Sequence, residues 1–388
     1  MQFFLSCDIS NKALVRRLII NKIFGILTLG IYRFWGKTHF RRLLWQSIRI
    51  GNDRLTYHGT AKELFLGFLI AIVILAVLFG IVGILLQILV ISIPVMAFVA
   101  QLMNMVLLFG FWQFARYRLW RYRLSRTSYR TVRFYQMGSA LTYTGLYLWW
   151  GLLSVLSLGW AFPKLKAVTA NYRINNMAFG DQSFDYHGRS SDFYKIYWPV
   201  VAYSGIVGLV AAFAFYMSND FKAMFEMTAD GKIANPQAFL SLMGGYLGVL
   251  LVGGVLYAVA RVREFNYVIG KTRFSGAGFA ANLSVKSVFK IGLGVFLVNA
   301  VFLGAIGFGI WAVGQNPLLA IIIIVLFLVY FLAVNLVMYI FFYIPMLKLV
   351  CASIATDRVE VFSDVAASSH DAPAYGEGFA DALDVGAF

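Results

Sequence analysis

The chain has 388 residues, 61% of them apolar, and carries 33 lysines and arginines against 17 acidic residues, a formal net charge of +16. Several uncharged apolar stretches exceed the roughly 18 residues that mark a membrane span, which excludes a soluble fold. In a membrane protein the positive excess reflects cytoplasmic loops and anionic headgroups, so a nucleic-acid partner is not needed to explain it.

A basic, tryptophan-rich stretch follows the first and weakest apolar segment, at 13–35. Its aromatic side chains suit the headgroup region, and its basic side chains can reach phosphates while their stems stay in the apolar boundary. These candidate lipid- or partner-binding residues are Trp35, Lys37, Arg41, Arg42 and Trp45. The run from Arg54 to His58 then alternates like a half-buried strand, and Thr60 with Glu63 has the capping-box pattern of a helix start.

The same module recurs 129 residues later without a gap. The aligned pairs are Lys37 with Lys166, Gly51 with Gly180, and Tyr57, His58 and Gly59 with Tyr186, His187 and Gly188. Looser copies lie at 116–143 and 261–288. The chain is therefore predicted to be built by repetition of one juxtamembrane module. The basic candidates in the later copies are Arg116, Arg118, Arg121, Lys164, Lys166 and Arg173.

Six strong apolar segments indicate transmembrane helices, at 64–86, 91–114, 193–217, 239–260, 285–313 and 318–344. Lysine and arginine are concentrated in the modules, so the positive-inside rule places every module and the C-terminus in the cytoplasm. Crossings at 13–35 and 140–162 would each send the following module to the other side. We therefore interpret these two segments as re-entrant or in-plane elements, with an ordinary eight-span protein as the alternative.

The predicted fold class is an all-α polytopic membrane protein. It has six strong transmembrane helices, two re-entrant or in-plane apolar segments, basic amphipathic helices and short cytoplasmic β-strands that could pair into a small sheet. The predicted division is a first repeat half at 1–163, with basic modules 36–62 and 116–139, and a second at 164–345, with basic modules 164–192 and 261–284. Residues 346–388 form a cytoplasmic exit and an acidic, flexible tail that begins at Val359.

Few residues suggest chemistry. The turn residues Tyr57, His58, Gly59, Tyr186, His187 and Gly188 are interpreted as structural. The two histidines invite a metal site, but no carboxylate or cysteine shares their local spacing. Cys7 and Cys351 lie at opposite ends of the sequence, so a structural disulfide is not expected. No acidic residue lies inside a strong span, and no catalytic motif is present, so we expect neither an enzyme nor a cofactor nor a metal.

The run Thr28-Leu-Gly-Ile-Tyr-Arg-Phe-Trp-Gly-Lys37, with Tyr57-His-Gly-Thr-Ala-Lys-Glu-Leu-Phe65 after it, resembles the YjgN family of bacterial inner-membrane proteins. The chain departs from the family at Arg33-Phe34, where members often place a proline before the tryptophan. The family is a domain of unknown function. The resemblance implies a multi-pass protein of the inner membrane. Some relatives are encoded near membrane metallopeptidases, which makes such a peptidase a candidate partner.

Two hypotheses about function follow. The first is a non-catalytic scaffold or adaptor that binds a protein partner and anionic lipid through its cytoplasmic basic-aromatic face, and the absence of intramembrane carboxylates favours it. The second is a channel or transporter for an anionic solute or lipid, formed by pseudo-symmetric halves. A scaffold and a transporter could each be a homo-oligomer.

Overall fold

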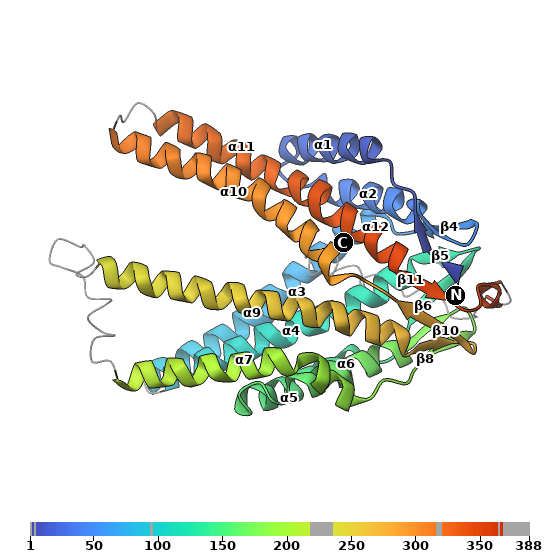
Figure 1. Ribbon diagram of the computed structural model, residues 1–388, viewed down its shortest axis with the longest axis horizontal. Coiled ribbons are helices and arrows are strands. Elements are labelled where there is room, and N and C mark those ends of the chain that lie inside the picture. The colour runs from blue at the N-terminus through green and yellow to red at the C-terminus, as the bar shows by residue number, and fades with distance from the viewer. Residues whose placement is uncertain are drawn as a thin grey trace.

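The described strands gather at one end of the molecule, and the long helices extend from them toward the other end (Figure 1). This computed structural model describes residues 2–3, 5–93, 96–217, 236–315, 320–363 and 365–367. The polar loop at 218–235 and the acidic tail from 368 onward lie outside these ranges.

Six helices of the described chain are long and apolar enough to cross a membrane, and they coincide with the six predicted strong spans. Their apolar side chains are largely exposed, as expected of surfaces that face lipid rather than a protein core. They are α3 (Ala61–Ser92), α4 (Ala97–Ser125), α7 (Ser190–Met217), α9 (Pro236–Gly270), α10 (Val285–Gln315), and α11 (Ala320–Met338) with its continuation through η3 (Tyr339–Tyr343) and α12 (Ile344–Ser353).

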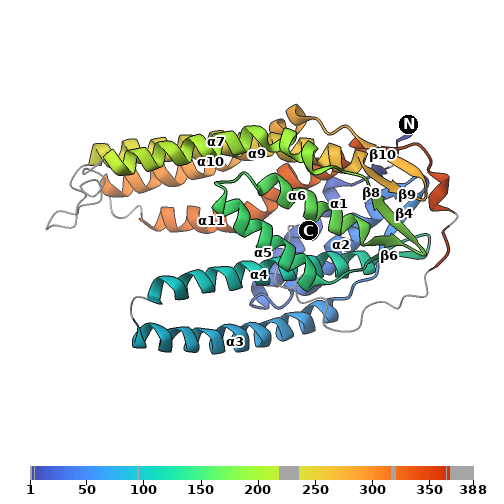
Figure 2. The same cartoon turned by 90° about the horizontal axis from the view of Figure 1, so that it is seen from below.

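Two helical hairpins occupy the weaker apolar segments. They pair α1 (Asn11–Leu27) with α2 (Arg33–Ser47), and α5 (Ala140–Leu156) with α6 (Phe162–Asn175). The breaks fall at matching positions, with φ of 50° at Leu29 and Leu158, and 89° and 93° at the glycines that follow. The strand before each hairpin pairs with the strand after it, so both hairpins enter and return at the sheet. Figure 2 shows α1 and α5 as shorter than the long helices. That the two hairpins are re-entrant or in-plane elements stays a prediction.

All eleven described strands form one antiparallel sheet, in the order β1-β11-β10-β9-β8-β7-β6-β5-β4-β3-β2. The strands are β1 (Gln2–Phe3), β2 (Leu5–Cys7), β3 (Ile48–Ile50), β4 (Asp53–Tyr57), β5 (Thr127–Tyr129), β6 (Val132–Gln136), β7 (Met177–Phe179), β8 (Gln182–Tyr186), β9 (Thr272–Phe274), β10 (Ala277–Ala281) and β11 (Ile354–Thr356).

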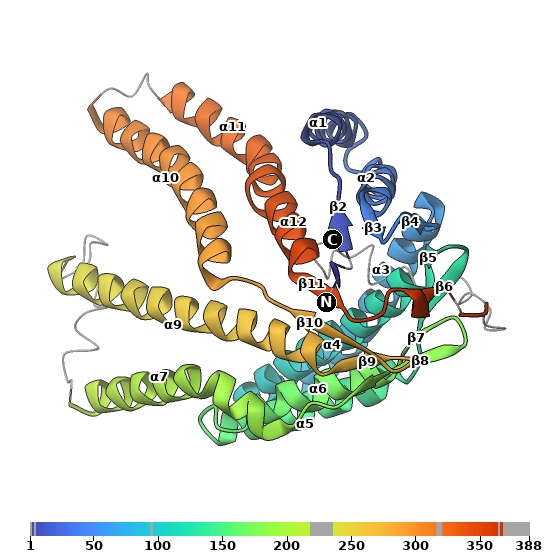
Figure 3. The same cartoon turned by 45° about the vertical axis from the view of Figure 1, so that its right-hand side comes forward.

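The sheet nearly closes into a barrel because its two outermost strands are neighbours in the chain. One residue separates β1, which pairs with β11, from β2, which pairs with β3. Figure 3 shows the strands grouped around this end. The all-α prediction is therefore wrong. Each three- or five-residue strand is too short to stand out among long apolar helices, and the strands become stable by joining a common sheet.

Four hairpins of this sheet turn through two-residue loops. Each loop contains at least one residue with positive φ, as two-residue hairpin turns require. These residues are Gly51 in the first hairpin, Arg130 and Thr131 in the second, Gly180 in the third, and Ser275 and Gly276 in the fourth. The first two predicted basic modules thus each deliver one hairpin to the sheet, and so do the last two.

The principal core is a cluster of aromatic rings on the sheet, joined by the segment after β11. Phe274 lies 4.6 Å from Phe184 and 4.9 Å from Phe362 between ring centroids. Phe362 belongs to η4 (Glu360–Phe362) and is buried, as is Val365. The predicted flexible tail therefore begins too early at Val359, because residues 359–363 and 365–367 are still part of the folded structure.

The predicted boundary between halves at 163 and 164 stays a prediction. The sheet continues across it, since β6 pairs with β7.

Candidate functional site

A groove lined by basic side chains lies between α1, α2 and α11, with a volume of about 570 Å³. We call it the basic groove. Its basic residues are Lys22, Arg33, Lys37 and Arg41, and none of its described lining residues is acidic. The volume falls within the range of about 300–1,000 Å³ that is usual for small-molecule sites. The groove thus concentrates positive charge at a place large enough for a ligand.

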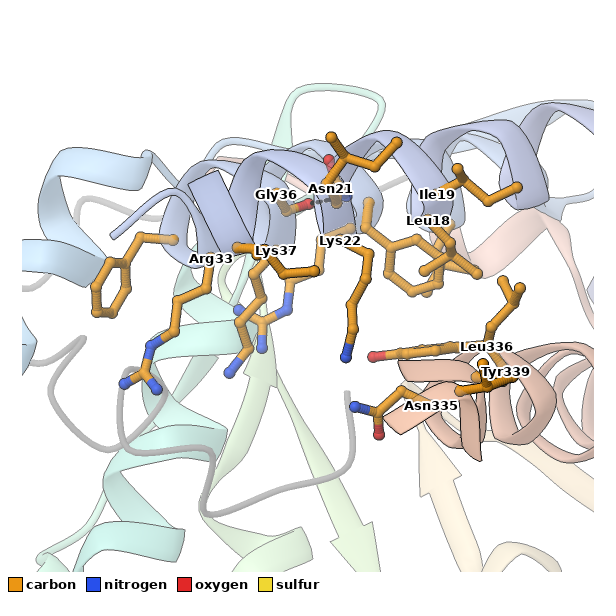
Figure 4. Close-up of a pocket in the computed structure, with 18 residues that line it drawn as sticks. Leu18, Ile19, Asn21, Lys22, Arg33, Gly36, Lys37, Asn335, Leu336 and Tyr339 are labelled. Atoms are coloured by element: carbon orange, nitrogen blue, oxygen red, sulfur yellow. Dashed lines mark hydrogen bonds between the residues drawn. The ribbon is translucent and has the colours of Figure 1, made fainter. Parts of the chain in front are cut away.

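Three charged side chains of the groove, Lys22, Arg33 and Lys37, project from α1 and α2, and that of Lys22 extends toward α11. Figure 4 shows Lys22 facing Asn335, with Arg33 and Lys37 projecting on the same side. The Lys22 ammonium lies 5.7 Å from the ring centroid of Phe331. The Arg33 guanidinium lies 4.8 Å from the ring of Phe68. Aromatic faces attract cations, so these rings help to hold the two side chains in place.

Two buried polar groups fix the floor of the basic groove. Asn21 donates from Nδ2 to the carbonyl of Gly36 at 3.0 Å, while its buried Oδ1 has no hydrogen-bond donor among the described residues. A Cβ at Gly36 would lie 3.0 Å from Asn21 Cγ, so the glycine allows α1 and α2 to approach closely. Arg41 is 1% exposed and donates to the Tyr57 hydroxyl at 3.4 Å. This anchors α2 on β4.

The rim of the groove is apolar. Ile19, Ile23 and Ile26 line it and remain exposed on α1. A ligand that matches both parts has an anionic group for the lysines and arginines and an apolar portion for the isoleucines. A hydroxyl on that ligand could also donate to Asn21 Oδ1.

The predicted turn residues have structural contacts. His58 shares a 2.7 Å hydrogen bond between its Nε2 and Ser128 Oγ, and burial, with nearby arginines, lowers its pKa. The Gly59 carbonyl accepts from Arg42 Nη2 at 3.2 Å. In the second copy, His187 is exposed and its backbone N–H donates to the Lys271 carbonyl. The described residues contain no group of three or more histidine, cysteine or acidic side chains placed to hold a metal.

The other predicted binding residues divide into two groups. The first group supports the packing of the helices. Trp45 donates to Thr127 Oγ1 at 2.8 Å, Lys164 donates to Ser190 Oγ at 3.0 Å, and Trp35 packs on Phe65. Arg118 lies 5.5 Å from the ring centroid of Phe114, and Arg121 is half-buried on α4.

The second group, Arg116, Lys166 and Arg173, meets around a smaller cavity between α4, α5, α6 and α9. Sequence reasoning did not place Arg261 and Glu264 in a site, although both line this cavity. It also left Lys22 and Arg33 out of the groove. A lysine within an apolar helix was the available signal for Lys22.

The two cysteines are free thiols, and they are neighbours in space. Cys7 in β2 lies 3.9 Å from Ser47 Oγ, and the neighbouring thiol of Cys351 in α12 is the largest influence that lowers the pKa of Cys7 to about 7. Closure of the barrel brings these distant positions together.

Residues 10–382 match a family model described as bacterial protein of unknown function (DUF898). No curated protein and no solved structure matches the chain.

Proposed function

The chain belongs to the DUF898 family of bacterial proteins of unknown function, which is the YjgN family that its motifs resemble, and we propose that it is a non-catalytic integral membrane protein that binds anionic lipid in the basic groove. We place it in the bacterial inner membrane with the barrel in the cytoplasm. The concentration of basic residues on the strand-bearing side supports this orientation.

The observation that carries the proposal is the composition of the groove. Four basic side chains and no described acidic one line a cavity whose rim is exposed and apolar. An anionic lipid offers the complementary pair of properties, a charged headgroup and an acyl chain. Because Asn21 Oδ1 needs a donor, a headgroup that also carries a hydroxyl, as in phosphatidylglycerol, fits best.

The expected energetic contribution is modest for each residue. An anionic membrane surface provides roughly 1 kcal/mol per nearby lysine or arginine. Neutralising both Lys22 and Lys37 should therefore cost about 2 kcal/mol, which is about a 30-fold loss of affinity. Larger losses would indicate hydrogen bonds to the headgroup in addition to this general attraction.

The test is lipid titration of the purified, delipidated full chain, read by native mass spectrometry. Phosphatidylglycerol is compared with phosphatidylcholine on wild-type protein and on the Lys22→Gln/Lys37→Gln double variant. The matched control is Lys62→Gln/Lys195→Gln, which removes two exposed lysines. We expect preferential binding of phosphatidylglycerol that only the groove variant loses. Equal binding of both lipids, or equal loss in the control, would refute the proposal.

Transport of an anionic solute or lipid is a second candidate, favoured by one specific observation. Positions 37, 40, 41 and 44 of α2 line the basic groove, and positions 166, 169, 170 and 173 of α6 line the smaller cavity. These sets align under the 129-residue offset, as expected if two repeated units carry related sites. Flux of labelled phosphatidylglycerol between leaflets of proteoliposomes tests this candidate. Retention of the lipid without flux supports binding alone.

A protein partner such as a metallopeptidase stays a prediction, as does a homo-oligomer. Affinity capture from native membranes distinguishes them from lipid binding. A stoichiometric protein partner recovered equally with the groove variant would favour a protein scaffold.

A further inference from the structure

The smaller cavity, which we call the basic chamber, has a volume of about 180 Å³. Residues of α4, α5, α6 and α9 line it. Figure 3 shows α4, α6 and α9 running toward the strands. Its basic residues are Arg116 on α4, Lys166 and Arg173 on α6, and Arg261 on α9. Its other titratable residues are Tyr143, Tyr147 and Glu264. The chamber is separate from the basic groove and shares no lining residue with it.

The only acidic side chain that lines the chamber is already engaged. Glu264 is 8% exposed, forms an ion pair with Arg261 and accepts a hydrogen bond from the Tyr197 hydroxyl. Among the described residues, its negative charge is thus compensated by one arginine and one hydroxyl. Glu264 therefore does little to neutralise the other three basic side chains of the chamber.

The remaining three cations contact aromatic rings instead of carboxylates. The ring centroid of Trp120 lies 4.7 Å from the Arg173 guanidinium and 5.1 Å from that of Arg116. The Lys166 ammonium lies 5.2 Å from the ring of Phe162 and 6.0 Å from that of Tyr257. Within the described chain, these three side chains have no acidic hydrogen-bond partner.

Like charges held around a buried cavity are costly unless an opposite charge joins them. The effect is seen in the pKa of Lys166, which burial and the neighbouring arginines Arg261, Arg116 and Arg173 lower to about 8. Glu264 acts in the other direction and raises this pKa. Burial lowers the pKa of Arg173 as well. An anion inside the chamber would remove the repulsion and restore full protonation of the lysine.

The size and donor set narrow the class of anion. A cavity of about 180 Å³ has room for the volume of roughly six water molecules, well below the size of a drug-like site. Arginine forks match tetrahedral oxyanions with paired hydrogen bonds, and lysine adds a point charge. Three cations suit an anion with more than one negative charge.

We propose that the basic chamber binds a phosphate-type oxyanion, held by Arg116, Lys166 and Arg173 against the aromatic wall of Trp120. The oxyanion is either a free ion or the headgroup of a lipid that reaches between the helices. Both sources present the same tetrahedral group to the same side chains.

The experiment uses the full chain in phosphatidylcholine nanodiscs, titrated with inorganic phosphate and with sulfate by isothermal calorimetry. A second arm measures retention of phosphatidic acid on the detergent-purified chain by native mass spectrometry. Variants are Arg116→Gln, Lys166→Gln and the conservative Lys166→Arg, with Lys62→Gln as the exposed control. Size-exclusion chromatography confirms that each variant is folded and monodisperse.

We expect saturable binding that weakens about tenfold or more in each Gln variant, because each loses a charge-assisted hydrogen bond. Lys166→Arg and Lys62→Gln should keep affinity within a few-fold of wild type. Binding of inorganic phosphate identifies a free ion as a source, whereas retention of phosphatidic acid alone identifies a headgroup. Absence of both in the wild-type chain overturns the proposal, and so does equal weakening in Lys62→Gln.

If neither Gln variant folds, Glu264→Gln provides an independent test. It removes the negative charge from the chamber while keeping a side chain that can hydrogen-bond. The proposal then requires tighter binding of sulfate than in wild type, and unchanged or weaker binding contradicts it.

Discussion

Replacing Gly180 by alanine tests whether the segment after β11 is packed over the sheet as described. Gly180 has φ of +58° in the loop between β7 and β8. A Cβ there would lie 2.9 Å from Val132 Cγ1 and closer still to the Ala366 carbonyl oxygen and the Val365 side chain. The neighbouring Asp181 N–H donates to that same carbonyl at 3.2 Å. The added methyl group therefore has to displace backbone.

Gly51 is a matched reference for this change. It occupies the aligned position in the loop between β3 and β4 with φ of +59°, but its Cβ would meet only Val359 Cγ1, at 3.6 Å. Gly51→Ala should therefore cost about 1–2 kcal/mol, the penalty of left-handed backbone for a residue with a Cβ. Gly180→Ala adds overpacking of about 1–3 kcal/mol and a weakened hydrogen bond, for a total of about 3–6 kcal/mol.

The assay is equilibrium unfolding in mixed detergent micelles, with both substitutions made in the full chain and in a chain that ends after Ser363. In the shortened chain, Ala366 and Val365 are absent, so the cost of Gly180→Ala should fall toward that of Gly51→Ala and exceed it only by the remaining contact with Val132. A difference of several kcal/mol that persists without residues 364–388 would refute the packing described here.

Three other predictions concern single sites. Gly188→Val should destabilise the protein more than His187→Ala in the same unfolding assay, because a side chain at position 188 would overlap the hydroxyl of the tyrosine two residues before it. Similar losses would argue against a structural role for the glycine. Alkylation of Cys7 should be half-maximal near pH 7, since the reactive thiolate forms above the pKa, and Cys351→Ala should move this midpoint upward. An unchanged midpoint would show that the thiols are not in contact. Sulfate affinity should fall as pH rises through about 8, because Lys166 is charged below its pKa and neutral above it, and Lys166→Arg should abolish this fall. If the variant Lys166→Arg showed the same pH dependence of sulfate affinity as the wild-type chain, the titrating group would not be Lys166.

The strands were predictable only where alternation extends over enough residues. The pattern at Arg54–His58 identified β4, but its partners β3 and β5 have three residues each. Three residues do not establish a period, and their side chains read as extensions of the preceding basic helices. The size and closure of the sheet follow from pairing between hairpins, which is not encoded within any one module.

The candidate sites were predictable as residue types and unpredictable as clusters. Lys37 and Lys166 were found from their position beside aromatic residues in the basic helices. Their neighbours Lys22 and Arg261 come from other helices, and only the three-dimensional arrangement brings them to the groove and the chamber. No disulfide was expected between Cys7 and Cys351, and both are free thiols. Their proximity was not predicted, because sequence separation says little about distance in a structure whose first and last strands are neighbours.

Ring closure also imposes an order on synthesis. Among the described strands, β1 and β2 leave the ribosome first, and β2 can pair once β3 follows at Ile48. Each later hairpin then adds to the free edge of the growing sheet, while β1 waits for β11 at Ile354. Unpaired strand edges can associate with other chains. The incomplete sheet therefore exposes two such edges until β11 has been synthesised. A ribosome that stalls before Ile354 releases an open sheet, which a chaperone or quality-control protease could distinguish from the finished ring.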